Sequence, residues 1–375
     1  MCIKRQFFSI LCILLMGGPL APGGAADTRL PLSALRITAP LDFCGENVPL
    51  DHPDVRERME REILISAWNQ PQVILWLKRS GRYMPTIEKI LRENRMPDDL
   101  KYVAIAESAL RPHVGSPKGA RGVWQFMEGT GTRYRLRVDD DFDERRSFLA
   151  STRAALNYLK DLYAMFGSWT LAVAAYNMGE SGLQAEMLIQ KVSNYYQLYL
   201  PLETQQYDFR ILSAKLILSN PVRYGYHLPV EEIYTPPAAE EVSIRCPQDT
   251  PVQIIAQSAR TYYKVIKDLN PEIRGYYLPA GQHVLLIPRG AAAGFQARFE
   301  GLFNQWLSDR KANVYVVKKG ESLSVIAERF NVPLQAILAW NRIPLKRKLN
   351  PGDRLIIFPN GKKLSEPQET IRKQR

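Results

Sequence analysis

The sequence feature that most constrains the fold is an internal repeat in the C-terminal third of the chain. Residues 251–288 align without gaps onto residues 322–359, at a constant offset of 71. Identical residues mark the alignment: Ile255, Ala256, Ile266, Asn270, Leu278, Gly281 and Pro288 match Ile326, Ala327, Ile337, Asn341, Leu349, Gly352 and Pro359. Each copy has the pattern strand, helix, helix, strand. The repeat therefore predicts two copies of one small βααβ module.

A predicted helix, residues 290–312, connects the two copies. Four of its aromatic residues recur at helical spacing: Phe295, Phe299, Phe303 and Trp306. This stripe favours a packing face over a ligand site. We place the first copy at residues 241–289 and the second at 313–359, and we expect a disordered basic tail at 360–375.

The region before the repeat has a helical pattern throughout. Residues 27–83 form a predicted N-terminal helical segment, residues 84–219 a compact helical domain, and the Pro-rich, acidic residues 220–240 a linker. Within the domain, one helix is expected to start at Pro97 and to end near Pro112. Further helices are predicted from Ser147 to Gly167, over 169–177 and over 203–220. The expected fold class is mainly α, followed by two small βααβ modules.

The first 26 residues have the layout of a secretory signal peptide. Lys4 and Arg5 precede an apolar run from Phe7 to Met16, and small residues lead to a cleavage point after Ala26. The apolar run is too short to span a bilayer comfortably, and a retained N-terminal anchor is the alternative. We therefore expect an exported protein of the periplasm or cell envelope.

Export affects how the charge and the cysteines are interpreted. The formal net charge of +12 favours anionic partners, namely nucleic acid, anionic lipid or an anionic cell-wall polymer. Export argues against nucleic acid and leaves peripheral association with the wall or a membrane surface. After cleavage the chain keeps Cys44 and Cys246, which can form a disulfide in an oxidising compartment. Two buried free thiols are the alternative.

A carboxylate in the segment YVAIAESAL, residues 102–110, is the first candidate for chemistry. Glu107 lies seven residues after Leu100 and three before Leu110, which places it on the apolar stripe of the expected helix. Burial raises the pKa of a carboxyl group, and a helix C-terminus acts in the same direction. Such a group can hold a proton near neutral pH and deliver it to a leaving oxygen. The structural alternative is a core-edge residue, or an ion pair with Arg111.

Three further segments follow Glu107-Ser108 in order. SPKGARGVWQFM (116–127) is a Gly-containing loop with an aromatic–amide pair, AAYNMG (174–179) ends a helix, and ETQQY (203–207) opens one. Together the series resembles the lytic transglycosylases with a goose-type-lysozyme-like (SLT) catalytic domain. The resemblance covers about residues 84–215 and the C-terminal repeats. It implies a lysozyme-like helical domain with an open groove for a glycan strand.

The resemblance also implies roles for the matched residues. Glu107 matches the single catalytic acid/base. The residues matched to the substrate groove are Ser108, Ser116, Gln125, Tyr176, Asn177 and Tyr207, and the last of these orients the catalytic carboxylate. One departure is Trp124, where many relatives carry Met. We expect this change to alter groove packing rather than chemistry.

Glycosidases commonly use two carboxyl groups, and other acids are present in this sequence. The acidic run 139–144 sits in a polar loop and is most simply a solvated turn, while Glu180 and Glu203 lie elsewhere. The resemblance implies that no second carboxylate is required. Glu107 would protonate the glycosidic oxygen between N-acetylmuramic acid and N-acetylglucosamine, and the muramic 2-acetamido group would stabilise the cationic intermediate. Glu107 would then deprotonate the muramic C6 hydroxyl, which closes a 1,6-anhydro ring.

No cofactor and no metal are expected. The four histidines, His52, His113, His227 and His283, are scattered along the chain. The sequence contains no HxxxH, CxxC, GxGxxG or P-loop motif.

The second copy of the repeat resembles a LysM module, which binds N-acetylglucosamine-containing glycans. The features that carry the resemblance are GESL at 320–323, the segment around Asn341, and LNPGDRLIIFP at 349–359. Glycan contacts are expected at Gly320, Glu321, Ser322, Leu323, Asn341, Arg342, Ile343 and Pro344. The first copy has Asp249 and Thr250 in place of Gly320 and Glu321. Whether it binds glycan or serves as a spacer is therefore left open.

The sequence as a whole predicts an enzyme that cleaves peptidoglycan strands without hydrolysis and is tethered to the wall by its modules. Two alternatives remain, a muramidase that uses water on the same fold and a glycan-binding scaffold with an idle site. The intact set of Glu107, Gln125, Tyr176, Asn177 and Tyr207 argues against the scaffold. The sequence does not set the oligomeric state, or whether cleavage starts within strands or at their ends.

Overall fold

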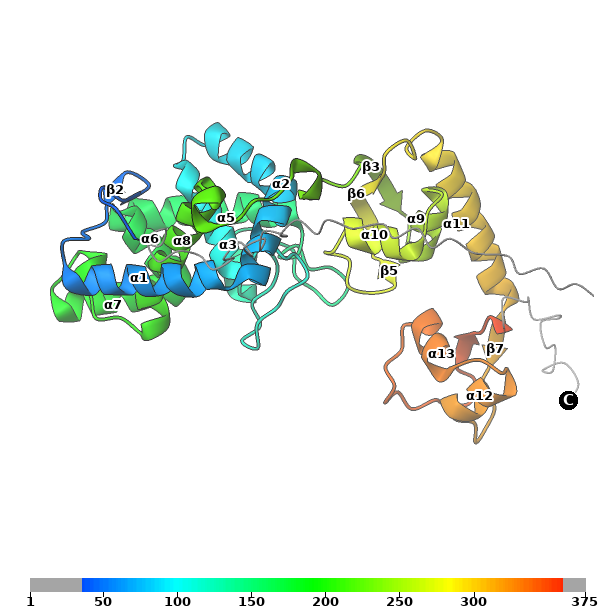
Figure 1. The fold of residues 1–375 in the computed structure, drawn as a ribbon. Coiled ribbons are helices and arrows are strands. Elements are labelled where there is room, and N and C mark those ends of the chain that lie inside the picture. The colour runs from blue at the N-terminus through cyan, green and yellow to red at the C-terminus, as the bar shows by residue number, and fades with distance from the viewer. Residues whose placement is uncertain (1–35, 360–375) are drawn as a thin grey trace, which may run out of the picture.

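The structure is a computed structural model, and it describes residues 36–359. A large helical domain is followed by two small modules, with a long helix leading from the first module to the second (Figure 1). The expected signal peptide, residues 1–26, and the basic tail, residues 360–375, lie outside the described residues. None of the helices within residues 36–359 is both long enough and apolar enough to cross a membrane.

The helical domain begins with a short hairpin of β1 (Asp42–Phe43) and β2 (Glu46–Asn47). Its helices are α1 (Pro53–Trp68), α2 (Gln70–Glu93), α3 (Val103–Ser108), α4 (Glu128–Arg133), α5 (Phe148–Phe166), α6 (Trp169–Met178), α7 (Glu180–Gln190) and α8 (Leu202–Ser219). Short 3-10 turns lie at Asp98–Tyr102, Tyr195–Gln197, Pro221–Tyr224 and Val230–Glu232. The mainly helical fold class is confirmed, and α5, α6 and α8 match the predicted helices to within two residues.

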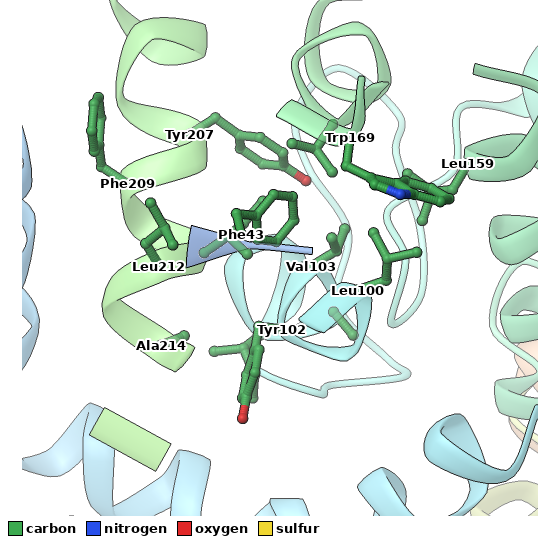
Figure 2. Packing of buried hydrophobic residues seen from close by; sticks show 14 of the residues in the cluster. Phe43, Leu100, Tyr102, Val103, Leu159, Trp169, Tyr207, Phe209, Leu212 and Ala214 are labelled. Carbon is green, nitrogen blue, oxygen red and sulfur yellow. The ribbon is translucent and has the colours of Figure 1, made fainter. Parts of the chain in front are cut away.

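One hydrophobic core holds the whole helical domain together, from Ile37 to Tyr226. Figure 2 shows how distant segments meet in it: Phe43 belongs to β1 of the N-terminal hairpin, Val103 to α3, and Leu212 to α8. Helix α2 continues across the boundary expected at residue 83, and its Ile87 and Leu91 are fully buried. The N-terminal helical segment is therefore part of the helical domain, because its apolar residues have no separate core.

The helix expected from Pro97 to Pro112 is α-helical over only part of that range. It begins as a 3-10 turn, Asp98–Tyr102, and continues as the short helix α3. Helix α3 ends at Ser108 because Ala109 and Leu110 adopt positive φ angles of 53° and 58°. Periodicity alone did not indicate this early end, since neither residue is a glycine.

The first module contains β3 (Ala239–Cys246), β4 (Thr250–Pro251), α9 (Val252–Ser258), α10 (Tyr263–Leu269), β5 (Tyr277–Leu278) and β6 (Gly281–Pro288). Strands β3 and β6 pair antiparallel, with Ala239 opposite Pro288. The second contains β7 (Val314–Val316), α12 (Leu323–Arg329), α13 (Leu334–Asn341) and β8 (Arg354–Ile356), and helix α11 (Phe295–Ala312) joins the two. The βααβ prediction is confirmed, although β3 starts within the expected linker.

The asparagine shared by the two copies has the same structural role in both. The side-chain amide of Asn270 donates to the backbone oxygens of Ile266 and Leu286, at 2.8 Å each, and its oxygen accepts from the Leu286 N–H at 2.7 Å. Asn341 makes the same set of bonds to Ile337 and Ile356. Each asparagine thus ties the second helix of its module to the last strand. The expected glycan contact of Asn341 therefore competes with an internal role.

The acidic run 139–144 is a solvated turn only in part: Asp139 and Asp140 are exposed, whereas the residues after them form contacts within the protein. Phe142 is buried against the core of the first module, and the backbone N–H of Asp143 donates to the Glu272 oxygen at 2.8 Å. The backbone N–H of Arg274 donates in turn to the oxygen of Asp141, also at 2.8 Å. This segment joins the helical domain to the first module. Its polar composition gave no sign of that contact because only Phe142 is apolar.

Of the two alternatives for the cysteines, the structure shows free thiols and not a Cys44–Cys246 disulfide. Cys44 packs against the core of the helical domain, whereas Cys246 is buried in the core of the first module. The two side chains therefore belong to separate cores. Burial raises the pKa of both thiols, which disfavours their reactive thiolate forms.

Candidate active site

The candidate site forms where α3 meets α8. The early end of α3 places Glu107 in its last turn, and Tyr207 lies on the side of α8 that packs against α3. The Tyr207 hydroxyl donates a hydrogen bond to Oε1 of Glu107. Figure 2 shows the Tyr207 ring within the packed core, where only 3% of the residue is exposed. Core packing therefore fixes the position of the donor to the candidate acid.

The surroundings of Glu107 favour its protonated form. Burial raises the pKa of its carboxyl group to about 7, the hydrogen bond from Tyr207 opposes this rise, and the charge of Glu203 adds to it. Burial and the neighbouring carboxylate raise the pKa of Tyr207 far above its usual value, so its hydroxyl stays a donor. Glu107 can therefore hold a proton at neutral pH and, once ionised, keep one charge-assisted hydrogen bond.

The ion pair between Glu107 and Arg111, which was the structural alternative to a catalytic role, does not form. The Arg111 Nε instead donates to the backbone oxygen of Ser108 at 2.9 Å, and within residues 36–359 no ion pair involves Glu107. Glu107 is therefore a half-buried acid whose only direct hydrogen-bond partner in the described structure is a tyrosine hydroxyl. A carboxyl group in these surroundings is better suited to proton transfer than a carboxylate held in a structural salt bridge.

The loop 116–127 is held by hydrogen bonds from residues close to Glu107. The Tyr176 hydroxyl donates to the backbone oxygen of Trp124 at 2.7 Å, and the Trp124 indole donates to Thr152 at 2.9 Å. Trp124 is fully buried, so it supports the loop from within the core and does not line an open surface. Gly122 has a φ of +82°, and a Cβ there would lie 1.7 Å from the Arg145 oxygen, so this turn requires glycine.

The serine next to Glu107 holds the same loop. Ser108 is 3% exposed, and its hydroxyl donates to the Val123 oxygen at 2.7 Å and accepts from the Arg111 N–H at 3.1 Å. This matched serine is therefore committed to protein partners. Ser116 is half-buried at the start of the loop, where its hydroxyl accepts from the Ala120 N–H at 3.1 Å.

The two matched amide side chains are also partly engaged. Gln125 is half-buried and donates to the Gly122 oxygen at 2.7 Å. Asn177 is half-buried beside Tyr176, and its side-chain oxygen accepts from the Thr204 hydroxyl at 2.8 Å. Sequence reasoning missed Thr204, although it stands inside the ETQQY segment that supplied Tyr207. The sequence carried no signal for Thr204, because its burial in the first turn of α8 is known only from the structure.

The other acids considered as a second carboxylate have different surroundings. Glu180 forms an ion pair with Arg133 and accepts a hydrogen bond from Tyr158, and these contacts lower its pKa to about 2. Asp143 is buried in an ion pair with Arg145. Glu203 is exposed in the first turn of α8 and acts on Glu107 through its charge. Unlike Glu180, Asp143 and Glu203, Glu107 lies beside the matched residues with a pKa that allows it to donate a proton near neutral pH.

Most residues expected to contact glycan in the second module have internal partners. Glu321 accepts hydrogen bonds from Tyr315 and from the Lys318 N–H, and it forms an ion pair with Arg329. Ser322 caps α12, and Leu323 is buried. Gly320 has a φ of +85° in the same loop.

The C-terminal half of the expected glycan-contact set lies at the end of α13. Arg342 forms ion pairs with Asp141 of the helical domain and Asp249 of the first module. Ile343 packs against the core of its own module, and Pro344 is exposed. The first module therefore uses Asp249, one of its departures from the second copy, as a contact between modules.

No metal centre is indicated in the part of the chain that the structure describes. There, His, Cys, Asp and Glu side chains do not gather in any group of three or more that could hold a metal ion.

Comparisons with known protein families agree on two kinds of domain. The Transglycosylase SLT domain matches residues 84–197, and the LysM domain matches residues 252–287 and 315–358. The chain is 30% identical over 334 residues to the membrane-bound lytic murein transglycosylase D of Escherichia coli strain K12, which covers 84% of this chain and 72% of that protein. The protein of the same description from Escherichia coli O6:H1 gives the same values.

Two weaker similarities cover parts of the chain. A putative tributyltin chloride resistance protein of Alteromonas sp. is 32% identical over 110 residues, which covers 28% of this chain and 53% of that protein. The crystal structure of the Bacillus cereus spore cortex-lytic enzyme SleL is 22% identical with a TM-score of 0.12, and it covers 32% of this chain and 22% of that one. The SleL similarity is too low to support any argument about this chain.

Proposed function

The chain belongs to the family of membrane-bound lytic murein transglycosylase D and is a cell-wall lytic transglycosylase, and we propose that Glu107 is its single acid/base. The observation that carries the proposal is the half-buried Glu107 carboxyl group, whose pKa burial raises to about 7 and which Tyr207 orients. A general acid works best when its pKa lies near the working pH.

The proposed reaction uses the Glu107 carboxyl group twice, first as an acid and then as a base. Glu107 protonates the glycosidic oxygen between N-acetylmuramic acid and N-acetylglucosamine, and the C1–O bond of the muramic residue breaks. The muramic 2-acetamido group stabilises the positive charge at C1. The Glu107 carboxylate then takes the proton of the muramic C6 hydroxyl, whose oxygen bonds to C1. The products are a 1,6-anhydro end and a new N-acetylglucosamine end, no water is consumed, and Glu107 is again protonated.

The neighbouring residues support this cycle in proposed roles. Tyr207 positions the carboxyl group and stabilises it when it is ionised. Tyr176 and Asn177 lie at the end of α6 and Gln125 lies in the loop 116–127; all three are half-buried, so part of each side chain can still meet a sugar. Ser108 is proposed as a positioning residue because its hydroxyl is fully engaged within the protein.

The modules bind peptidoglycan, as their membership of the LysM domain family supports. Covalent linkage to the helical domain raises the effective concentration of Glu107 at an insoluble polymer. We place the protein in the cell envelope, and more specifically in the periplasm after removal of residues 1–26. The basic surplus of the chain would add peripheral attraction to anionic wall components.

The test is mass spectrometry of the soluble products released from purified peptidoglycan by the mature protein. Anhydro-muropeptides are expected from the wild type, and none from Glu107→Gln, which keeps the size of the side chain and removes its acidity. Reducing-end products, heavier by one water, would make the protein a muramidase. If the wild type releases nothing and still sediments with the wall, the protein is a binding scaffold.

A further inference from the structure

An aromatic pocket lies between the two modules and the helix that connects them. Its volume is about 610 Å³, within the usual range for ligand sites. Residues of α9, β5, α11 and α13 all line it, and Figure 1 shows α13 on the side of the second module that faces β5. Its aromatic residues are Tyr263, Tyr276, Tyr277, Trp306, Trp340 and Phe358.

The predicted packing face of α11 explains only part of its aromatic stripe. Phe295, Phe299 and Phe303 are buried in the core of the first module, as expected for such a face. Trp306, at the end of the stripe, is only half-buried and lines the pocket. On the opposite side of the pocket, Trp340 is also half-buried and packs edge-on against Phe358, with 5.4 Å between ring centroids. Aromatic rings left uncovered at a concave site indicate a ligand rather than core packing.

Contacts between the modules hold the two sides of the pocket together. The Tyr277 hydroxyl of the first module donates to the backbone oxygen of Trp340 in the second, at 3.3 Å. Arg342 forms its ion pairs with Asp249 and Asp141, and its guanidinium lies 5.5 Å from the centre of the Tyr277 ring. The pocket is therefore preformed, so a ligand need not bring the modules together.

The polar groups of the pocket favour an uncharged ligand. Four glutamine side chains line it, and all four residues are exposed: Gln253, Gln257, Gln305 and Gln335. Within the described residues, no lysine or arginine lines this pocket, although the chain as a whole is basic. The charged residue that does line it is Asp309, whose carboxylate disfavours an anionic ligand, while the Arg310 guanidinium lies on the Trp306 ring, 4.9 Å from its centre. Amides and flat rings instead suit a sugar, whose C–H face packs on aromatic rings while its hydroxyl and acetamido groups bond to amides.

The pocket shares two lining residues with a second cavity. A neighbouring space of about 350 Å³ is lined by the same Tyr277 and Trp340, together with Asn341 and Arg342 at the end of α13. The two rings therefore contribute to both cavities. Such an arrangement fits an elongated ligand made of repeated units better than a compact one.

We infer that the two modules and α11 form one composite site for a chain of N-acetylglucosamine-containing sugars, with Tyr276, Trp306 and Trp340 as its stacking platform. This inference rests on the proposed function, because peptidoglycan is the source of such a chain. The first module contributes one wall of the site even though its own first loop departs from that of the second. The site is separate from the loop contacts expected at Gly320–Leu323 of the second module alone.

The test measures binding of a soluble N-acetylglucosamine hexamer to the full mature chain by isothermal titration calorimetry. Tyr276→Ala is the main variant, because Tyr276 is 64% exposed and its loss leaves the core intact. Tyr262→Ala is the matched control, since Tyr262 is 81% exposed in the same module and does not line the pocket. We expect binding to weaken about tenfold or more for Tyr276→Ala and to stay unchanged for Tyr262→Ala.

Tryptophan fluorescence gives a second readout that does not depend on a truncated side chain. Trp306→Phe and Trp340→Phe keep an aromatic ring, and each should reduce the emission change that the hexamer causes. Trp68→Phe is the control, because Trp68 is 58% exposed on α1, away from the modules. If Trp306→Phe and Trp340→Phe both show the same emission change with the hexamer as the wild type does, the composite site is wrong.

The same outcomes separate this inference from the proposed function. Wild-type release of anhydro-muropeptides tests the chemistry of Glu107 and does not involve the hexamer. Normal release together with unaltered hexamer binding by Tyr276→Ala would overturn the composite site alone. Specific hexamer binding without any anhydro products would retain the composite site and overturn the proposed chemistry.

Discussion

The helical domain and the paired modules build their sites in different ways. In the helical domain, the pKa of one carboxyl group, that of Glu107, depends on burial, on the hydrogen bond from Tyr207 and on the charge of Glu203. In the modules, several aromatic rings from separate elements line a preformed pocket. Chemistry concentrated in one carboxyl group can be abolished by one substitution, whereas binding spread over several rings should decline in steps. The predictions below test this difference.

The largest effect is expected for Glu107→Gln. Loss of a general acid and base should lower kcat by about 10³-fold, within the usual range for such groups. Binding of the N-acetylglucosamine hexamer should not change, because the aromatic pocket has no residue in common with the active site. Turbidity clearance of purified peptidoglycan measures the first quantity, and calorimetry the second. A parallel loss of both would mean that the two regions do not act separately.

The same variant should also report the cost of burying Glu107. Because burial raises the pKa of Glu107 to about 7, the folded protein binds the proton more tightly than the unfolded chain does. The stabilisation linked to that proton is complete below the unfolded pKa and is lost as the pH rises through about 7. Glu107→Gln should therefore stabilise the protein at pH 8, by up to about 3 kcal/mol, and have little effect near pH 4. Thermal unfolding at both pH values measures this difference.

The second largest effect on activity is expected for Tyr207→Phe. Loss of the hydroxyl leaves Glu107 without its direct partner, and kcat should fall roughly 10-fold to 100-fold. The hydrogen bond from Tyr207 lowers the pKa of Glu107, so its removal should raise that pKa from about 7 to a higher value. The reactive form is protonated, so the alkaline limb of the pH–rate profile should move to higher pH. A lower rate with an unmoved limb would assign Tyr207 a merely structural role.

The two modules can be compared directly through their shared asparagines. Asn270→Ala and Asn341→Ala each remove three hydrogen bonds that tie the second helix to the last strand. We expect a loss of about 2–4 kcal/mol in local stability. Asn270→Ala should be the more damaging because Asn270 is 1% exposed and Asn341 is half-buried.

Hydrogen exchange can read the two modules separately in the intact chain. Each substitution should speed exchange in its own module and leave the helical domain protected. Asn304→Ala on the exposed side of α11 is the matched control and should change little. Equal effects in both modules would mean that their contact through Arg342 and Tyr277 couples them into one unit.

The sequence predicted the elements that depend on local patterns, but it did not predict the contacts between residues far apart in the chain. Helices α5, α6 and α8 followed from apolar spacing and helix-ending residues, and the βααβ modules followed from the repeat. Periodicity did not show that residues 36–83 share a core with α8, or that the acidic run 139–144 joins the first module. Those contacts link residues far apart in the chain. The composition of the acidic run also resembles that of an ordinary surface segment.

The candidate site shows the same limit at the level of single residues. The order of motifs drew attention to Glu107 and Tyr207, which the structure places in contact although 100 residues separate them. The hydroxyl of Thr204, which supports Asn177, and the backbone of Arg145, which requires glycine at position 122, carried no such signal. Supporting residues are hard to predict because their function depends on which neighbour the fold supplies.

The smallest predicted effect, for Glu203→Gln, tests how Glu107 is tuned. The negative charge of Glu203 raises the pKa of Glu107, so its removal should lower that pKa and move the alkaline limb to lower pH, opposite to Tyr207→Phe. Glu203 is exposed, so water and salt screen its charge; the shift should be small and should shrink as ionic strength rises. Glu60→Gln changes the net charge equally on exposed α1 and should leave the limb in place. A shift as large as that of Tyr207→Phe would mean that neighbouring charge, rather than burial, sets the proton affinity of Glu107.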